Sequence, residues 1–265
     1  MKRWIVFLYG IFSYLMFLGV FLYAVGFIGN LWISNSLDSE PSIGFWAALG
    51  IDVGLLLLFA VQHSVMARPV FKKWLTRYIP ESAERSTYIL LSNVAMILIF
   101  AFWQPLGGTI WSIENQLVSN FVYGIYFFGW LFLLVSTFGI CHFDLFGLRQ
   151  IWLFLNNKPY TYHEFNVSVL YSMVRHPIYL AWSIIIWATP TMTMSHLVFA
   201  AGYTLYILVA IRFEERDLVG AFGQQYRVYR KQVPMMVPGP KSFGKNTNNL
   251  TSPPSVFDER FEKRA

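Results

Sequence analysis

The chain has 265 residues, of which 56% are hydrophobic, 19% aromatic and 13% charged, and its formal net charge is +6. Soluble domains contain about 25% charged residues, so this composition excludes a soluble globular protein and predicts a polytopic membrane protein. The single cysteine, Cys141, excludes both an intrachain disulfide and a metal site built from cysteines.

Four apolar segments are long enough to cross the hydrocarbon core of a bilayer, which takes about 20 residues. In chain order they are residues 4–32, 43–63, 86–103 and 120–141. The first is too long for the apolar region of a signal peptide and has no clear cleavage site, so we expect a retained anchor. Tryptophan and tyrosine cluster near segment ends, as is typical of rings anchored at the membrane interface.

Two shorter apolar segments, residues 178–189 and 196–213, flank a Pro-Thr-Met-Thr turn that begins at Pro190. They predict either a thin pair of spans or a re-entrant hairpin. The expected fold is therefore all-α: a membrane helical bundle with four long spans, a short C-terminal helical hairpin (five to six transmembrane segments) and a cytoplasmic helical cap. The chain has no strand pattern and no glycine-rich phosphate loop, so a soluble dinucleotide-binding domain is not expected.

The basic residues are unevenly distributed among the connecting segments. All 20 Lys and Arg fall at the amino terminus, in residues 64–85 and 141–177, and after residue 211. The loops expected on the opposite side carry none: residues 33–42, 104–119 and 190–195. The positive-inside rule then places both termini in the cytoplasm of a multi-pass inner-membrane protein. Nothing indicates nucleic acid as a partner.

We divide the chain into three regions. Residues 1–140 are expected to form the N-terminal transmembrane helices, and residues 141–240 a cofactor-binding catalytic region that includes the hairpin. Residues 241–265 are rich in Asn, Ser and Pro and are predicted to be disordered.

A first polar motif, Arg175-His176-Pro177, precedes the hairpin. Proline is favoured in the first turn of a helix, so a helix is expected to begin at Pro177. The free N–H groups and positive dipole end of that helix would suit a carboxylate or another anion. Arg175 adds a fork of hydrogen-bond donors for the same ligand, and His176 can donate or accept. The alternative is an interfacial arginine beside a capping histidine.

A second motif lies where the last apolar segment leaves the membrane, a depth at which ionisable groups are costly and indicate function. Either Glu214 or Glu215 could pair with Arg175 or Arg212, and the other could accept hydrogen bonds from ribose hydroxyls or an amino group. If residues 212–229 are one helix, a single face carries Glu215, Leu218, Phe222, Gln225 or Tyr226, and Tyr229. The alternative is an amphipathic interfacial helix with ordinary ion pairs.

The loop after the fourth long segment alternates polar groups with large apolar side chains. Its His142, Asp144 and Arg149 could wall a small pocket and supply a base, or form a surface turn with an Asp144–Arg149 pair. Four histidines lie on the side expected to be cytoplasmic: His63, His142, His163 and His176. His63 is a conceivable metal ligand, but no two of the four have the spacing of a metal site, so no metal site is predicted.

The two motifs resemble the isoprenylcysteine carboxyl methyltransferase superfamily: Arg-His-Pro-x-Tyr from Arg175, Glu-Glu-x-x-Leu-x-x-x-Phe-Gly-x-x-Tyr-x-x-Tyr from Glu214, and a Val-Pro close at Val233. Four further segments resemble, more narrowly, the methanethiol S-methyltransferase family: Gln62–Pro69, Glu84–Tyr88, His142–Gln150 and Ala188–Thr193. The resemblance covers roughly residues 45–240. One departure is Ala181, where the wider superfamily commonly has glycine.

This resemblance implies an enzyme that transfers a methyl group in line from S-adenosylmethionine to the thiolate of methanethiol, giving dimethyl sulfide and S-adenosylhomocysteine. It implies a small volatile thiol and the lipid bilayer as partners. The residues it assigns to the cofactor are Tyr171, Val174, Arg175, His176, Pro177, Tyr179, Leu180, Arg212, Glu214, Glu215, Leu218 and Phe222. Removal of Glu215 or Arg175 is expected to abolish cofactor binding.

A free alkyl thiol ionises above neutral pH, so the enzyme needs a base. From their position, Asp144 and His142 are the candidate proton acceptors, with Arg149 orienting them or compensating charge. Three alternatives stay open: a related methyltransferase for an isoprenylcysteine or a phospholipid, a sterol-type reductase that binds NADPH, and a scaffold or transporter subunit without activity.

Overall fold

The computed structural model describes residues 2–161 and 165–239. The predicted tail of residues 241–265 and His163 lie outside these ranges. The helices are α1 (Lys2–Gly29), α2 (Phe45–Met66), α3 (Pro69–Leu75), α4 (Glu81–Phe102), α5 (Gln116–Ile140), α6 (His142–Leu145), α7 (Leu148–Leu155), α8 (Val169–Met173), α9 (Pro177–Trp187), α10 (Met194–Phe222) and α11 (Gln224–Gln232). The strands are β1 (Thr109–Ser112) and β2 (Thr191–Thr193).

Among the described residues, the helices long and apolar enough to cross a membrane are α1, α2, α4, α5 and α10. The prediction of an all-α, polytopic membrane protein is therefore confirmed. The sequence predicts a short last segment over residues 196–213, whereas α10 has 29 residues. The helix continues past the apolar segment into the charged residues 214–217 and on to Phe222, because this stretch contains mostly good helix formers.

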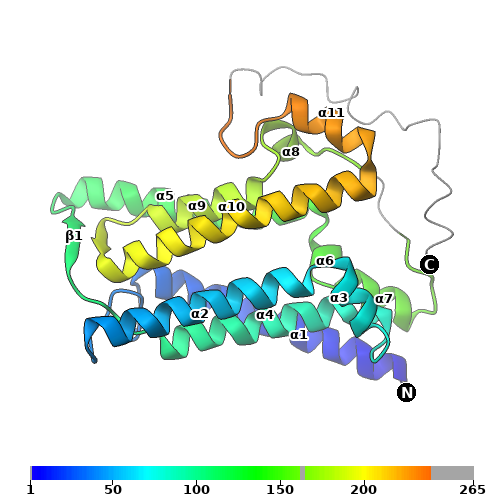
Figure 1. Ribbon diagram of the computed structural model, residues 1–265, viewed down its shortest axis with the longest axis horizontal. Coiled ribbons are helices and arrows are strands. Elements are labelled where there is room, and N and C mark those ends of the chain that lie inside the picture. The colour runs from blue at the N-terminus through cyan, green and yellow to red at the C-terminus, as the bar shows by residue number, and fades with distance from the viewer. Residues whose placement is uncertain (1, 162–164, 240–265) are drawn as a thin grey trace.

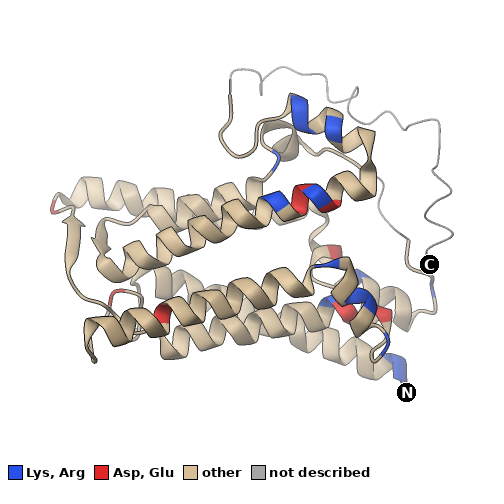
Figure 2. Cartoon of the chain, viewed as in Figure 1, with Lys and Arg blue, Asp and Glu red and all other residues tan. Residues whose placement is uncertain are grey.

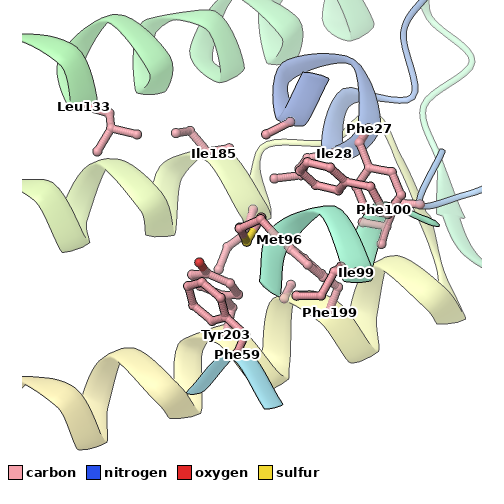
Figure 3. Close-up of a cluster of buried hydrophobic side chains, with 14 of the residues drawn as sticks. Phe27, Ile28, Phe59, Met96, Ile99, Phe100, Leu133, Ile185, Phe199 and Tyr203 are labelled. Carbon is pink, nitrogen blue, oxygen red and sulfur yellow. The ribbon is translucent and has the colours of Figure 1, made fainter. Parts of the chain in front are cut away.

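The long helices form two layers (Figure 1). In one layer α4 contacts α1 and α2, and in the other α9 contacts α5 and α10. Apolar side chains from all six helices meet in the main core, which Figure 3 shows in close-up. The labelled side chains are Phe27, Ile28, Phe59, Met96, Ile99, Phe100, Leu133, Ile185, Phe199 and Tyr203. This core joins the layers into one bundle.

The hairpin of α9 and α10 extends to the far end of the bundle. α9 has 11 residues, about 16 Å at 1.5 Å per residue, which is about half of a 30 Å hydrocarbon core. Residues 188–193 continue without helix, and β2 pairs antiparallel with β1, Met192 opposite Trp111. The structure thus favours a hairpin of full length over one that turns back half-way, and its turn includes a short ribbon that the sequence does not predict.

The turn of this hairpin is tied to the loop after α1 by a buried polar cluster. Asp38 accepts a hydrogen bond from the hydroxyl of Thr193 and lies 3.2 Å from Nδ1 of His196. Nε2 of His196 lies 2.9 Å from the carbonyl oxygen of Ile186. Because His196 is fully buried, these bonds satisfy polar groups that would be costly to bury alone.

Lys and Arg gather at one end of the bundle, with the N-terminus, α3, α7 and α11 (Figure 2). Within the described ranges, the opposite end shows acidic residues but no Lys or Arg. The separation of charge that the sequence predicts is therefore present in the fold. The side of the membrane that the basic end faces stays a prediction from the positive-inside rule.

Short helices cap the basic end of the hairpin (Figure 1). Residues 212–229 are helical on both sides of Gly223 but do not form one continuous helix, because α10 ends immediately before Gly223 and α11 begins immediately after it. Gly223 has φ 55° and ψ −124°, a conformation that favours glycine and changes the direction of the chain. α11 then lies against α8, where the Tyr229 hydroxyl donates to the carbonyl oxygen of Tyr171 at 2.6 Å.

Candidate active site

The Arg175-His176-Pro177 motif forms the start of α9, as the sequence predicts. Pro177 is the first helical residue and His176 precedes it. The backbone N–H groups of Arg175 and His176 donate to the carbonyl oxygens of Pro234 and Met235, at 2.9 and 3.1 Å. The segment after α11 therefore holds the motif in place. The first turn of α9 directs its N–H groups, which have no partner within the helix, towards the cap.

Glu215 of α10 is surrounded by basic groups. One of its oxygens lies 2.8 Å from Nε of Arg175 and 3.2 Å from Nε2 of His176, and the other lies 3.7 Å from Nη1 of Arg230. Arg175 also donates to the carbonyl oxygens of Arg230, at 3.0 Å, and of Val233. The side chains of Arg175 and Glu215 are only 11% and 12% exposed, so this network joins α9, α10 and α11 in a partly dry environment.

Glu214, the preceding residue of α10, has a different environment. Its side chain is 41% exposed, and its carboxylate lies 3.8 Å from Nδ1 of His176. The hydroxyl of Tyr179 hydrogen-bonds to it. Its charge also acts on the hydroxyls of four other tyrosines, namely Tyr88, Tyr171, Tyr206 and Tyr226. Glu214 is thus a partly exposed carboxylate that is hydrogen-bonded to Tyr179 and whose charge acts on four further phenol groups.

The two tyrosines of the cap on which this charge acts, Tyr171 and Tyr226, keep their protons. Burial raises the pKa of Tyr171, and the charge of Glu214 raises it further. Burial and the charges of Glu215 and Glu214 raise the pKa of Tyr226 in the same direction. Both hydroxyls are therefore protonated at neutral pH and able to donate hydrogen bonds.

The other residues that the sequence assigns to a cofactor lie in three kinds of place. Val174 and Pro177 are buried where the chain enters α9, and Leu180 is partly exposed in the next turn. Leu218 and Phe222 pack in an apolar cluster of the cap, together with Tyr171, Phe165, Val167, Tyr226, Tyr229 and Val233. Arg212 is exposed on α10.

His142, one of the predicted proton acceptors, is buried in α6. Its ring nitrogens lie 2.8 Å from the hydroxyls of Tyr14 in α1 and Thr137 in α5. Burial lowers the pKa of His142 below its ordinary value, so the ring is neutral at pH 7 and one nitrogen donates while the other accepts. These contacts link α6 to α1 in one layer and to α5 in the other.

Asp144 and Arg149, the other predicted catalytic residues, lie on α6 and α7. Asp144 lies 3.4 Å from Arg149 and accepts a hydrogen bond from Tyr160 at 2.9 Å. Arg149 donates to the backbone and side chain of Thr161. These contacts of Asp144 and Arg149 are made with the segment that precedes α8 and not with Arg175 or Glu215. A catalytic role for Asp144 and Arg149 therefore stays a prediction.

Tyr88 and Tyr206 are not predicted as site residues from the sequence, although the charge of Glu214 acts on both hydroxyls. Tyr88 ends the Glu84–Tyr88 segment, which carries part of the family resemblance, and this was the available signal. Tyr206 precedes Glu214 by eight residues, close to two helical turns, so helical periodicity places both on a similar face of α10.

Curated relatives match almost the whole chain. A methanethiol S-methyltransferase from Crocosphaera subtropica is 52% identical over 238 residues, which cover 90% of this chain and 93% of the relative. A methanethiol S-methyltransferase from Mycobacterium tuberculosis is 47% identical over 240 residues, covering 91% and 98%. The chain belongs to the methanethiol S-methyltransferase family. The resemblance indicated by the sequence motifs is therefore confirmed.

The methanethiol S-methyltransferase family has a more distant membrane relative. Nurim from Xenopus laevis is 30% identical to this chain over 205 residues, which cover 70% of each protein. No family model and no solved structure match the chain.

Proposed function

We propose that this chain uses S-adenosylmethionine to methylate methanethiol to dimethyl sulfide at a site embedded in the membrane. The names of its relatives support methyl transfer and this acceptor. The proposed donor rests on the residues of the cap. When bound, it supplies a methyl group on a positively charged sulfur, which a thiolate can attack.

The observation that carries this proposal is the different environment of Glu214 and Glu215. Glu215 is paired with Arg175 and Arg230 and contacts His176, so its role is to assemble the cap. Glu214 is partly exposed and faces phenol groups. Its carboxylate fits an ammonium group or ribose hydroxyls, and the nearby start of α9 fits a carboxylate. S-adenosylmethionine carries all of these groups.

The position of the site suits the two substrates. The polar donor reaches the basic end of the bundle from water, and we propose that this end and both termini face the cytoplasm of the inner membrane. Methanethiol and dimethyl sulfide are small and apolar, so they partition into the bilayer and can pass between helices. The binding of donor and acceptor side by side lowers the entropic part of the barrier.

The test supplies the purified, lipid-reconstituted protein with S-adenosylmethionine and methanethiol and measures dimethyl sulfide in the headspace. Glu214→Gln removes the proposed ligand charge. We expect it to weaken S-adenosylhomocysteine binding by about 10-fold or more, because a hydrogen bond to a charged group contributes about 1.5–3 kcal/mol.

Asp217→Asn is the matched control, since Asp217 lies on the same helix and pairs with Arg68 at 2.7 Å. It should bind S-adenosylhomocysteine as the wild type does. No dimethyl sulfide from the wild type, or wild-type affinity in Glu214→Gln, would contradict the proposal.

A further inference from the structure

A polar cluster lies inside the bundle, between α2, α4 and α10. The hydroxyl of Tyr88 lies 2.6 Å from Nε2 of His63, and Nδ1 of His63 lies 3.0 Å from the hydroxyl of Ser92. Tyr88 is only 8% exposed, whereas His63 is partly accessible. Tyr206 contacts the ring of His63 edge to face at 6.3 Å. Titratable groups at this depth of a membrane bundle indicate function.

This cluster adjoins the proposed donor site. The charge of Glu214 acts on the hydroxyls of Tyr88 and Tyr206. The same carboxylate is hydrogen-bonded to Tyr179 of α9. A ligand held by Glu214 therefore lies on the same side of α10 as the Tyr88–His63 pair.

The surroundings of Tyr88 suit a small apolar acceptor. Met66, Ile89 and Phe146 pack with Tyr88 in one apolar cluster, and Phe59 stacks on His63 with ring centroids 5.1 Å apart. A methylthiol placed here would meet apolar groups around its carbon and a hydroxyl at its sulfur. Sulfur in alkyl thiols is itself soft and weakly polar, which fits surroundings made of apolar side chains and one hydroxyl.

We propose that Tyr88 and His63 form the acceptor site and remove the proton of the thiol; this inference rests on the proposed function. The Tyr88 oxygen takes the S–H proton while the hydroxyl proton of Tyr88 passes to Nε2 of His63. The thiolate forms a new S–C bond to the donor methyl, and the electron pair of the broken bond stays on the donor sulfur. His63 later releases its proton to water.

Tyr88 is a catalytic residue in this scheme because it touches the thiol, and His63 acts through Tyr88. Nδ1 of His63 donates to Ser92 in the tautomer that leaves Nε2 free to accept. The titratable and charged groups that face the pair are Glu84 and Arg85 of α4, Tyr179 of α9, and Tyr203, Tyr206 and Glu214 of α10.

The experiment compares two acceptors of nearly the same shape, methanethiol and methaneselenol. A selenol is the stronger acid and is ionised at neutral pH, so it needs no base. We measure kcat/KM for both acceptors as a function of pH in the full chain, in Tyr88→Phe and in His63→Gln. S-adenosylhomocysteine binding reports folding and the donor site in each variant.

The matched control is Tyr126→Phe. Tyr126 is also buried, and its hydroxyl donates a bond of the same length, 2.6 Å, to the carbonyl oxygen of Val25. It lies in α5, outside the proposed cluster. This variant measures what the loss of a buried phenol hydroxyl does to the fold alone.

We expect Tyr88→Phe and His63→Gln to lower kcat/KM for methanethiol at pH 7 by about 100-fold, the usual scale of general-base catalysis. With methaneselenol they should change no more than Tyr126→Phe does. The deficit with methanethiol should shrink as the pH rises, because solution thiolate then replaces the base.

Equal losses with both acceptors would assign the pair a purely structural role and overturn the inference. Loss of S-adenosylhomocysteine binding in both Tyr88→Phe and His63→Gln would also overturn the inference. So would a loss of kcat/KM for methanethiol alone that appears in His142→Gln and not in these two variants. If the wild type methylates neither acceptor, the proposed function itself fails. If the wild type is active but the two variants lose kcat/KM equally for methanethiol and methaneselenol, the inference alone fails.

Discussion

Arg175 and Arg68 show how burial changes the energy of an ion pair. Arg175 lies 2.8 Å from Glu215 with both side chains about nine-tenths buried, and Arg68 lies 2.7 Å from Asp217 with side chains 30% and 40% exposed. Water screens the second pair, so exposed pairs contribute about 0–1 kcal/mol. Loss of one partner from a buried pair leaves a buried charge, which costs about 3–5 kcal/mol.

We therefore expect Arg175→Ala to lower the free energy of unfolding by about 3 kcal/mol, since the Glu215 charge would lose its closest partner. Arg68→Ala should lower it by about 1 kcal/mol or less. Thermal unfolding of both variants in the same detergent, without donor, measures the difference. Equal loss of stability in the two variants would show that Glu215 is not held in a dry network.

The packing of α5 against α9 depends on the absence of a side chain at Gly129. A Cβ atom there would lie 2.9 Å from Cγ1 and 3.3 Å from the backbone nitrogen of Ile185, and 3.1 Å from Cγ2 of Ile184. The backbone atom cannot move aside, so a larger residue must separate the helices. α9 carries the Arg175-His176-Pro177 motif at its start, and the separation would displace it.

Gly129→Val should destabilise the bundle by about 1–3 kcal/mol, the usual cost of overpacking. Gly124→Val is its control on the same helix, because Gly124 is exposed and a Cβ there meets no atom within 4 Å. Both changes alter the intrinsic helix propensity in the same way, so the difference between their unfolding midpoints isolates the α5–α9 contact. Identical midpoints would contradict close packing at Gly129.

At the scale of the whole molecule, hydropathy and basic charge were sufficient to predict the first four long spans and the basic end of the bundle, but not the full length of α10. The hairpin and its two flanking motifs also followed from sequence, because α9 begins at Pro177 and the acidic pair lies near the end of α10. The break at Gly223 did not follow, since the helical pattern continues on both sides and only the backbone conformation reveals it.

The residues of the proposed acceptor site could not be predicted from the sequence for a different reason. His63 of α2 and Tyr88 of α4 meet within one layer, and the packing of the two layers brings Tyr206 of α10 to them. A short motif predicts neighbours within one helix or one hairpin. A short motif does not indicate which face of a distant helix will pack against it.

The account depends on the donor lying between Glu214, the start of α9 and the Tyr88–His63 pair. An experimental structure of the lipid-reconstituted protein with S-adenosylhomocysteine tests this most directly. We expect ligand density in contact with Glu214 and the first turn of α9, with its sulfur facing Tyr88. Density elsewhere on the bundle, or a ligand whose sulfur faces away from Tyr88 towards Asp144, would contradict the account.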